Sequence, residues 1–292
     1  MTIIAGLKSK DGIVICADTQ ETFGVTKKDV PKLIFQPSEY SEGSTDDVAA
    51  AFCGAGDGPF IEKLIDNAWR DSLGAESLET FCNRIEDSIK STYADFGAIF
   101  QTGHCPSVDL IYGIKMGGRS KLFHAYGPVV IEKDVYVTAG NGSYIGDYIA
   151  GRTTSDRSIP LDRAVTLAVY ILEEAKKNVE GCGGESHVAI LRNNGASGRV
   201  GTRQIDTIAE TLNMIDRKLG LFLLKTADLS VSDEDFKKGH ESLVKIVTTL
   251  RDIRRTKLER DIAGWNVGME ALAGGKLPKT DRYGLREKED ET

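Results

Sequence analysis

The chain has 292 residues, of which 40% are hydrophobic, and carries a formal net charge of -7 with a sequence isoelectric point near 5.3. This length is sufficient to bury one sizeable core, and no apolar segment approaches the roughly 18 residues of a membrane span. The acidic balance, without any stripe of basic residues, argues against nucleic acid and against an anionic membrane as partners.

The five cysteines and four histidines form no metal or disulfide pattern. The cysteines stand singly, mostly within apolar runs, which is typical of reduced thiols in the cytoplasm. Cys182 is the exception, because Gly181-Cys182-Gly183-Gly184 has the composition of an exposed turn, although a lone thiol there is more often structural than nucleophilic. We therefore expect a soluble cytoplasmic protein with no cofactor and no metal site.

The first candidate functional residue is Thr2, which follows Met1 and precedes an apolar run over residues 3–7. Methionine aminopeptidase removes a methionine that precedes a small residue, so we expect the mature chain to begin at Thr2. Its free α-amine, with an unperturbed pKa of about 7.7–8.0, could take the proton from its own hydroxyl as the oxygen attacks a carbonyl. Thr2 could thus be both nucleophile and base; the alternative is that it only begins a strand.

Residues 2–8 and 13–18 are expected to form two strands joined by a tight hairpin, with Asp11-Gly12 as the turn signal. A turn centred near residues 10–11 would bring Asp18 beside Thr2, to within one residue of register. A further apolar run begins at Lys32. If Lys32 is buried near Thr2, its ammonium would lower the pKa of the amine and pair with Asp18; the alternative is a solvated lysine at a strand end.

Residues 58–205 combine helical and strand patterns. Apolar residues at helical spacing predict two amphipathic helices after Asp57, at Phe60, Ile61, Leu64, Ile65, Ala68 and Trp69 and then at Leu78, Phe81, Cys82, Ile85, Ile89 and Tyr93. Short runs separated by turns predict an antiparallel meander over residues 108–139. Residues 161–178 predict a helix that is covered on both sides. Blocks of helices between blocks of strands indicate an αββα arrangement of two packed sheets and two helical layers.

The end of the chain is predicted to be a helical extension, residues 206–273, followed by a flexible charged tail, residues 274–292. Apolar stripes predict one helix from Ile208 to Leu219 and a longer one from Ser232 to about Arg260. These stripes must cover an apolar surface. That surface belongs either to the same subunit or to a neighbouring subunit or partner, and the sequence leaves both alternatives open.

Six segments, in this order and spacing, carry a resemblance to a known family. They are residues 2–8, 11–22, 32–35, 52–57, 135–143 and 161–190. Together they resemble the catalytic β-type subunits of the proteasome and the related bacterial peptidase that works with a ring ATPase. The resemblance implies that residues 1–205 form an α+β fold, the four-layer αββα sandwich of N-terminal-nucleophile hydrolases.

The resemblance also implies catalytic roles. Thr2 would be the nucleophile, with Asp18 and Lys32 as its electrostatic partners. Asn141 and Cys182 fall where the family usually carries two serines near the nucleophile's amine. The resemblance therefore implies a catalytic set of Thr2, Asp18, Lys32, Asn141 and Cys182.

Substrate contacts follow from the same resemblance. Thr22 and Ala55 would bind the substrate strand through backbone hydrogen bonds. The walls of the pocket would come from residues near Glu21, Val30, Leu33 and Ala55. Two departures bear on activity: Val179 stands where the family has an acidic residue, which only Glu180 could replace, and the loop before Lys32 is shorter than usual.

We therefore predict a self-compartmentalising threonine endopeptidase. A homo-oligomeric ring would enclose the Thr2 sites and admit unfolded polypeptides or peptides, and a ring ATPase is a possible partner. Two alternatives stay open. One is a proteasome-like ring or scaffold subunit without peptidase activity, and the other is an N-terminal-nucleophile amidohydrolase that acts on a small amide, because a fold does not fix its substrate.

Overall fold

The structure is a computed structural model that describes residues 2–23, 26–37, 48–99, 106–154, 159–194, 196–228 and 230–252. Met1, Cys105, the predicted end of the second extension helix (residues 253–260) and the predicted tail (residues 274–292) lie outside the described residues. Spatial contacts divide the chain into two units, residues 1–210 and 211–292. Each unit is described by itself.

The first sheet of the larger unit has five strands in the order β10-β1-β2-β11-β12, and neighbouring strands are antiparallel. The strands are β10 (Tyr136–Ala139), β1 (Ile4–Ser9), β2 (Gly12–Asp18), β11 (Ser186–Arg192) and β12 (Gly198–Arg199). The predicted hairpin is confirmed, because β1 and β2 pair from Ile4 opposite Ala17 to Ser9 opposite Gly12. All seven residues of β2 are buried, as expected for a strand covered on both faces.

The second sheet has five antiparallel strands in chain order. They are β5 (Leu33–Gln36), β6 (Val48–Gly56), β7 (Val108–Met116), β8 (Arg119–Tyr126) and β9 (Val129–Lys133). The predicted meander holds for β7, β8 and β9, but β10 crosses to the first sheet and pairs with β1. The crossing buries Val137 and Ala139 between the sheets, whereas Val129 and Ile131 of β9 remain exposed. A separate two-stranded sheet joins β3 (Gln20–Phe23) to β4 (Thr26–Asp29).

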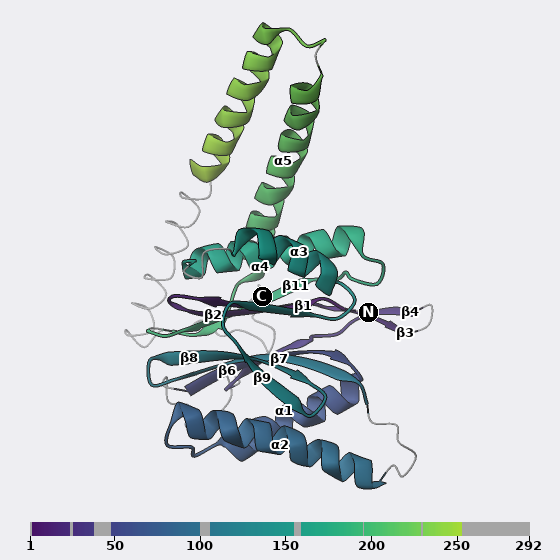
Figure 1. The fold of residues 1–292 in the computed structure, drawn as a ribbon, viewed down its shortest axis with the longest axis vertical. Coiled ribbons are helices and arrows are strands. Elements are labelled where there is room, and N and C mark those ends of the chain that lie inside the picture. Colours follow the sequence, from purple (N-terminus) through teal and green to yellow (C-terminus); the bar gives the residue numbers. More distant parts are fainter. Residues whose placement is uncertain are drawn as a thin grey trace, which may run out of the picture. The chain divides into compact units, whose positions relative to one another are not determined.

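Helices cover the outer face of each sheet (Figure 1), so the αββα arrangement predicted from the sequence is confirmed. The helices α1 (Gly58–Ser72) and α2 (Leu78–Ile99) flank the second sheet, and α3 (Ser143–Thr153) and α4 (Leu161–Asn178) flank the first. The Asp57 carboxylate caps α1 by accepting a hydrogen bond from the Phe60 N–H. The sequence pattern does not predict α3, a short helix that buries only Gly146, Ile149 and Ala150.

The two sheets pack on each other through small and aliphatic side chains. This layer includes Ile4, Ile15, Leu33, Cys53 and Ile111. The sheets approach closely at Gly6, where a Cβ would lie 2.6 Å from Leu122 Cδ1. A side chain at position 6 would therefore collide with side chains of the opposite sheet, and the packing between the sheets would have to change.

The second unit contains the end of α5 (Thr202–Ala227) and a further helix over residues 233–252. The predicted start of this helix at Ser232 is confirmed, because the Ser232 hydroxyl accepts a hydrogen bond from the Asp235 N–H. The helix predicted over residues 208–219 is too short, since α5 extends to residue 227.

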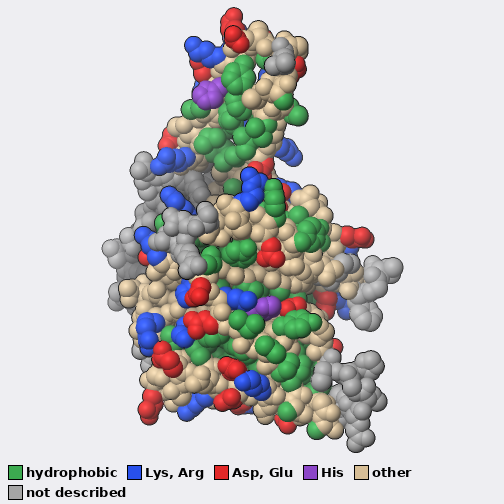
Figure 2. Space-filling view, in the orientation of Figure 1, with side chains coloured by type: hydrophobic (Ala, Val, Ile, Leu, Met, Phe, Trp, Pro, Cys, Tyr) green, Lys and Arg blue, Asp and Glu red, His purple; other side chains and the backbone are tan. Residues whose placement is uncertain are grey.

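Phe222 packs against Phe236, with ring centroids 5.3 Å apart. Hydrophobic side chains nevertheless gather on the exposed surface of these helices (Figure 2), including Leu221 and Leu224. No helix among the described residues is long and apolar enough to cross a membrane.

Candidate active site

Thr2 lies two residues before the first residue of β1 and is buried, with 8% of its surface exposed. Its carbonyl oxygen accepts a hydrogen bond of 3.1 Å from the Gly142 N–H. Gly140 has a φ of +83°, and a Cβ at this position would lie 2.4 Å from that same oxygen. Both the backbone angle and the close approach require glycine. The turn of residues 140–142 is thus built around Thr2.

Asp18, at the end of β2, is fully buried next to Thr2. Its Oδ1 accepts a hydrogen bond from the Ile3 N–H at 3.2 Å, and its Oδ2 accepts one from the Gly183 N–H at 3.0 Å. The Asp18 N–H donates in return to the Ile3 carbonyl. The structure therefore places the carboxylate one residue from Thr2, at the position that the hairpin register predicts.

Lys32 lies just before β5, and its ammonium donates to Asp18 Oδ1 at 2.8 Å and to the Gln20 carbonyl. The side chain is only 9% exposed. The alternative of a solvated lysine is therefore wrong. Burying an ion pair is costly unless the remaining polar atoms are bonded, and here two backbone N–H groups complete the bonding of Asp18. Because apolar residues in place of a buried ion pair are often as stable, the Lys32–Asp18 pair is consistent with a role other than stabilising the fold.

Gly184 of the expected exposed turn is exposed, but Cys182 itself is buried, with 6% exposure, so the expectation is wrong for the thiol. The turn is held inward because the Gly183 N–H bonds to Asp18 while its carbonyl accepts from the Gln20 N–H. A Cβ at Gly142 would lie 3.2 Å from Cys182 Sγ, so the thiol lies against the turn that contains Asn141. Burial, reinforced by the Asp18 charge, raises the pKa of Cys182 to about 11. The thiol is therefore protonated at neutral pH and is a poor nucleophile.

Val179 and Glu180 occupy the end of α4. The Val179 N–H bonds to the Ala175 carbonyl as the C-cap of that helix. Glu180 is exposed, and within the described ranges its carboxylate makes no hydrogen bond or ion pair. The structure therefore shows no acid at Val179 and no contact that would let Glu180 replace one.

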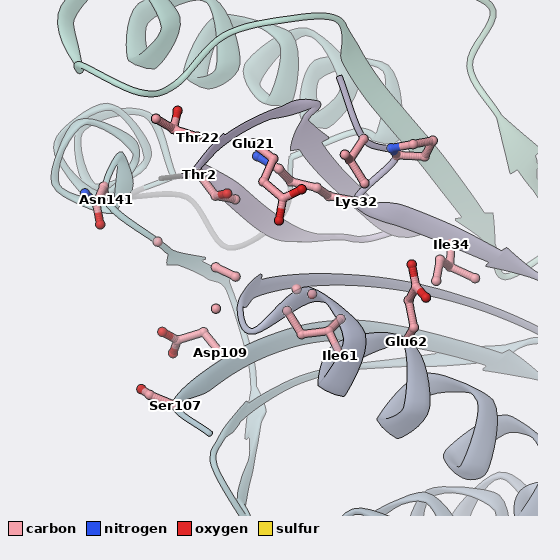
Figure 3. Close-up of a pocket in the computed structure, with 17 residues that line it drawn as sticks. Thr2, Glu21, Thr22, Lys32, Ile34, Ile61, Glu62, Ser107, Asp109 and Asn141 are labelled. Atoms are coloured by element: carbon pink, nitrogen blue, oxygen red, sulfur yellow. The ribbon is translucent and has the colours of Figure 1, made fainter. Parts of the chain in front are cut away.

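A pocket of about 340 Å³ lies beside Thr2, and residues from the second sheet, from β3, from α1 and from the segments next to β1 and β10 line it (Figure 3). The predicted site residues Thr2, Lys32, Asn141, Thr22 and Ala55 all line this pocket, whereas Asp18 and Cys182 lie behind it. Of the predicted walls, Glu21, Val30 and Ala55 are present.

Leu33 does not line the pocket. It is fully buried between the sheets, and its neighbours Lys32 and Ile34 line the pocket instead. Successive side chains of a strand point to opposite faces, so an error of one position exchanges the pocket face for the core face.

Three polar residues of the pocket are absent from the sequence-based expectation: Glu62, Ser107 and Asp109. Glu62 is on α1, and Asp109 is on β7 opposite Ala55 of β6. Only the pairing of β6 with β7 brings Asp109 to the site, and no local motif marks it. Within the described ranges, no group of three or more His, Cys, Asp or Glu side chains could hold a metal ion.

Thr19 is a further residue that sequence reasoning missed. Its hydroxyl donates to Asp29 Oδ1 at 2.8 Å and accepts from the Glu185 N–H at 2.7 Å. These bonds connect β4 to the turn that contains Gly183 and Gly184, and a Cβ at Gly184 would lie 2.3 Å from the Thr19 hydroxyl oxygen. Thr19 therefore holds the turn that donates to Asp18.

Comparison with known proteins finds likeness in structure rather than in sequence. No protein-family model matches the sequence, and no curated protein matches it. Similar solved structures include a Gly-1 mutant of Anbu from Hyphomicrobium sp. strain MC1, with a TM-score of 0.61, 14% identity, and coverage of 80% of this chain and 100% of that one. Anbu (ancestral beta-subunit) from Yersinia bercovieri has a TM-score of 0.60 and 16% identity, with 79% and 99% covered.

The Anbu complex from Pseudomonas aeruginosa, solved as a helical assembly, is similar to the same degree, with a TM-score of 0.61 and 15% identity over 80% of this chain and 99% of that one. Identities this low establish the fold and leave the activity open. The larger unit of this chain has a four-layer αββα fold that is similar to the fold of these Anbu structures.

Proposed function

We propose that the chain is a threonine peptidase that cleaves peptide bonds with Thr2 once Met1 has been removed. The observation that carries the proposal is the position of Thr2, which lies on a pocket of about 340 Å³ with the buried Lys32–Asp18 ion pair next to it. A peptide in the pocket would present its carbonyl carbon to the Thr2 hydroxyl.

The reaction needs a base, an oxyanion site and a leaving-group acid. The α-amine of Thr2 accepts the hydroxyl proton as the oxygen bonds to the carbonyl carbon, and then passes it to the departing amine. Water completes the cycle by hydrolysing the resulting ester. Within the described residues, the Asn141 N–H makes no backbone hydrogen bond. We assign it to the oxyanion, because donors fixed beforehand stabilise developing charge.

Lys32 and Asp18 position and tune Thr2 without entering the covalent chemistry. The positive charge of Lys32 favours the neutral form of a nearby amine, which is the form that acts as a base. Asp18 fixes both Lys32, through a 2.8 Å contact, and the backbone of Ile3. This pair would hold the ammonium in a constant place while the Thr2 amine gains and loses its proton.

Thr22 and Ala55, which both line the pocket, are proposed to bind the substrate backbone. Copies of the chain are further proposed to assemble into a closed homo-oligomer that restricts access to unfolded peptides, with a ring ATPase as a candidate partner. The likeness to an Anbu protein that forms a helical assembly supports assembly of this chain.

A ring or scaffold subunit without peptidase activity is the second candidate, because Val179 and the exposed Glu180 leave the site without the family's acidic residue.

The test replaces the nucleophile. Thr2→Ala is expected to reduce peptide hydrolysis by several orders of magnitude while leaving the oligomeric mass unchanged. Thr2→Ser keeps a hydroxyl on the first residue and is expected to retain measurable hydrolysis. Activity of Thr2→Ala within about tenfold of the unmodified protein would exclude Thr2 as the nucleophile.

A further inference from the structure

We infer that the pocket beside Thr2 selects a substrate with a cationic side chain, such as lysine or arginine, next to the scissile bond. This inference rests on the proposed function and names its substrate class. Three carboxylates line the pocket, from Glu21 of β3, Glu62 of α1 and Asp109 of β7 (Figure 3). They come from three separate elements that only the tertiary fold brings together.

The side chains that line the pocket carry more negative than positive charge. Lys32 is the only cation among the described lining residues, and its ammonium is bound at 2.8 Å by the fully buried Asp18. That pair is neutral as a whole. Asp109 Oδ1 and His124 Nε2 form a hydrogen bond of 2.8 Å, so one oxygen of the Asp109 carboxylate already has a partner. Glu21 and Glu62 add two further negative charges, and a bound cation would offset one of them and be attracted by both.

The shape of the pocket fits a long side chain with a charged end. Val30, Ile34 and Ile61 supply apolar surface for a methylene stem, and such a stem packs on apolar surface while its charged head meets polar groups. Glu21 also extends towards α1, since a Cβ at Gly58 would lie 3.6 Å from Glu21 Oε1. The carboxylates of β3 and α1 therefore border the same space. A volume of about 340 Å³ falls within the usual range for ligand pockets.

The carboxylates lie in the same cavity as the candidate nucleophile. Thr2 lines this pocket together with Glu21, Glu62 and Asp109 (Figure 3). A side chain bound among the carboxylates would therefore belong to a residue close to the bond that Thr2 is proposed to attack.

The experiment compares three fluorogenic peptides that differ only at the residue before the cleaved bond: lysine, leucine or glutamate. We expect kcat/KM for the lysine peptide to exceed that for the leucine peptide by about tenfold or more, because hydrogen bonds between charged groups are stronger than those between neutral groups. The glutamate peptide is expected to be the poorest substrate. Added salt should reduce the preference, since it screens partly exposed charges.

Two substitutions locate the preference. Glu62→Gln and Glu21→Gln should each lower the ratio of lysine to leucine kcat/KM by about fivefold. Asp66→Asn is the matched control, because Asp66 is exposed one turn further along α1 and does not line the pocket. It removes the same charge and should leave the ratio unchanged. Circular dichroism and melting curves check that each variant folds.

Binding separates this inference from the proposed function. Fluorescence anisotropy with Thr2→Ala measures binding of the lysine and leucine peptides without cleavage, and the lysine peptide is expected to bind more tightly. If the unmodified protein cleaves no peptide but this difference in binding persists, the proposed function fails and the inference stands. Equal cleavage or equal binding of the two peptides, no binding of the lysine peptide, or a preference that both glutamate substitutions leave intact would overturn the inference.

Discussion

The buried ion pair beside Thr2 gives a quantitative prediction for Lys32→Met. The substitution keeps an apolar stem of similar length but removes the ammonium from Asp18, which is fully buried. Removing one partner of a buried pair typically costs about 3–5 kcal/mol, because the other charge is left uncompensated. Asp18 keeps its bonds from the Ile3 and Gly183 N–H groups, so we expect the lower end, about 3 kcal/mol. For a unit of this size that lowers the melting temperature by about 6–12 °C.

Two comparisons isolate the pair in thermal denaturation. Lys90→Met removes an equally close ion pair with Glu86, at 2.6 Å, but both side chains are exposed, so a change of under about 0.5 kcal/mol is expected. Adding Asp18→Asn to Lys32→Met removes the uncompensated charge and should recover part of the lost stability. The recovery is incomplete because the amide nitrogen of asparagine cannot accept one of the two backbone hydrogen bonds that the Asp18 oxygens receive. If Lys32→Met melts within about 2 °C of the unmodified protein, then loss of the ammonium does not leave a costly unpaired charge on Asp18, and the reasoning is wrong.

Three further predictions concern other parts of the molecule. Gly140→Ala should lower the melting temperature more than Gly117→Ala, because both glycines have positive φ but only a Cβ at Gly140 meets an atom, the Thr2 carbonyl oxygen at 2.4 Å; equal shifts would show that the turn relaxes. Burial holds the Cys182 pKa near 11, so folded protein should react with iodoacetamide far more slowly at pH 8 than unfolded protein, and equal rates would contradict its placement. Leu224 is 72% exposed, and Leu224→Glu should reduce the oligomeric mass in light scattering without a change in melting temperature, whereas an unchanged mass would argue against an intersubunit role for α5.

Local patterns predict much of the fold. The β1–β2 hairpin, α1, α2 and α4 follow from residue spacing and turn signals within each segment. The helix α3 does not, because it buries few residues and contains Gly146 and Gly151 within a weak apolar pattern. The destination of β10 is also not local, since its pairing with β1 depends on which sheet edge is free.

The site divides in the same way. The positions of Thr2 and Asp18 follow from the β1–β2 hairpin, and Lys32 is expected at the start of the apolar run that forms β5, so these three positions could be predicted. Glu62 and Asp109 reach the pocket through α1 and through the pairing of β6 with β7, and no sequence signal marks them. The exchange of Leu33 for Ile34, by contrast, is a one-residue error in strand alternation.

The central claim is that Thr2 provides both the nucleophile and the base, and this requires a free amine on Thr2. Mass spectrometry of the N-terminus of the protein purified from its native host tests it most directly. The proposed mechanism predicts that the chain begins at Thr2, without Met1. A fully retained Met1 would leave the nitrogen of Thr2 in a peptide bond, where it cannot accept a proton, and would contradict the mechanism.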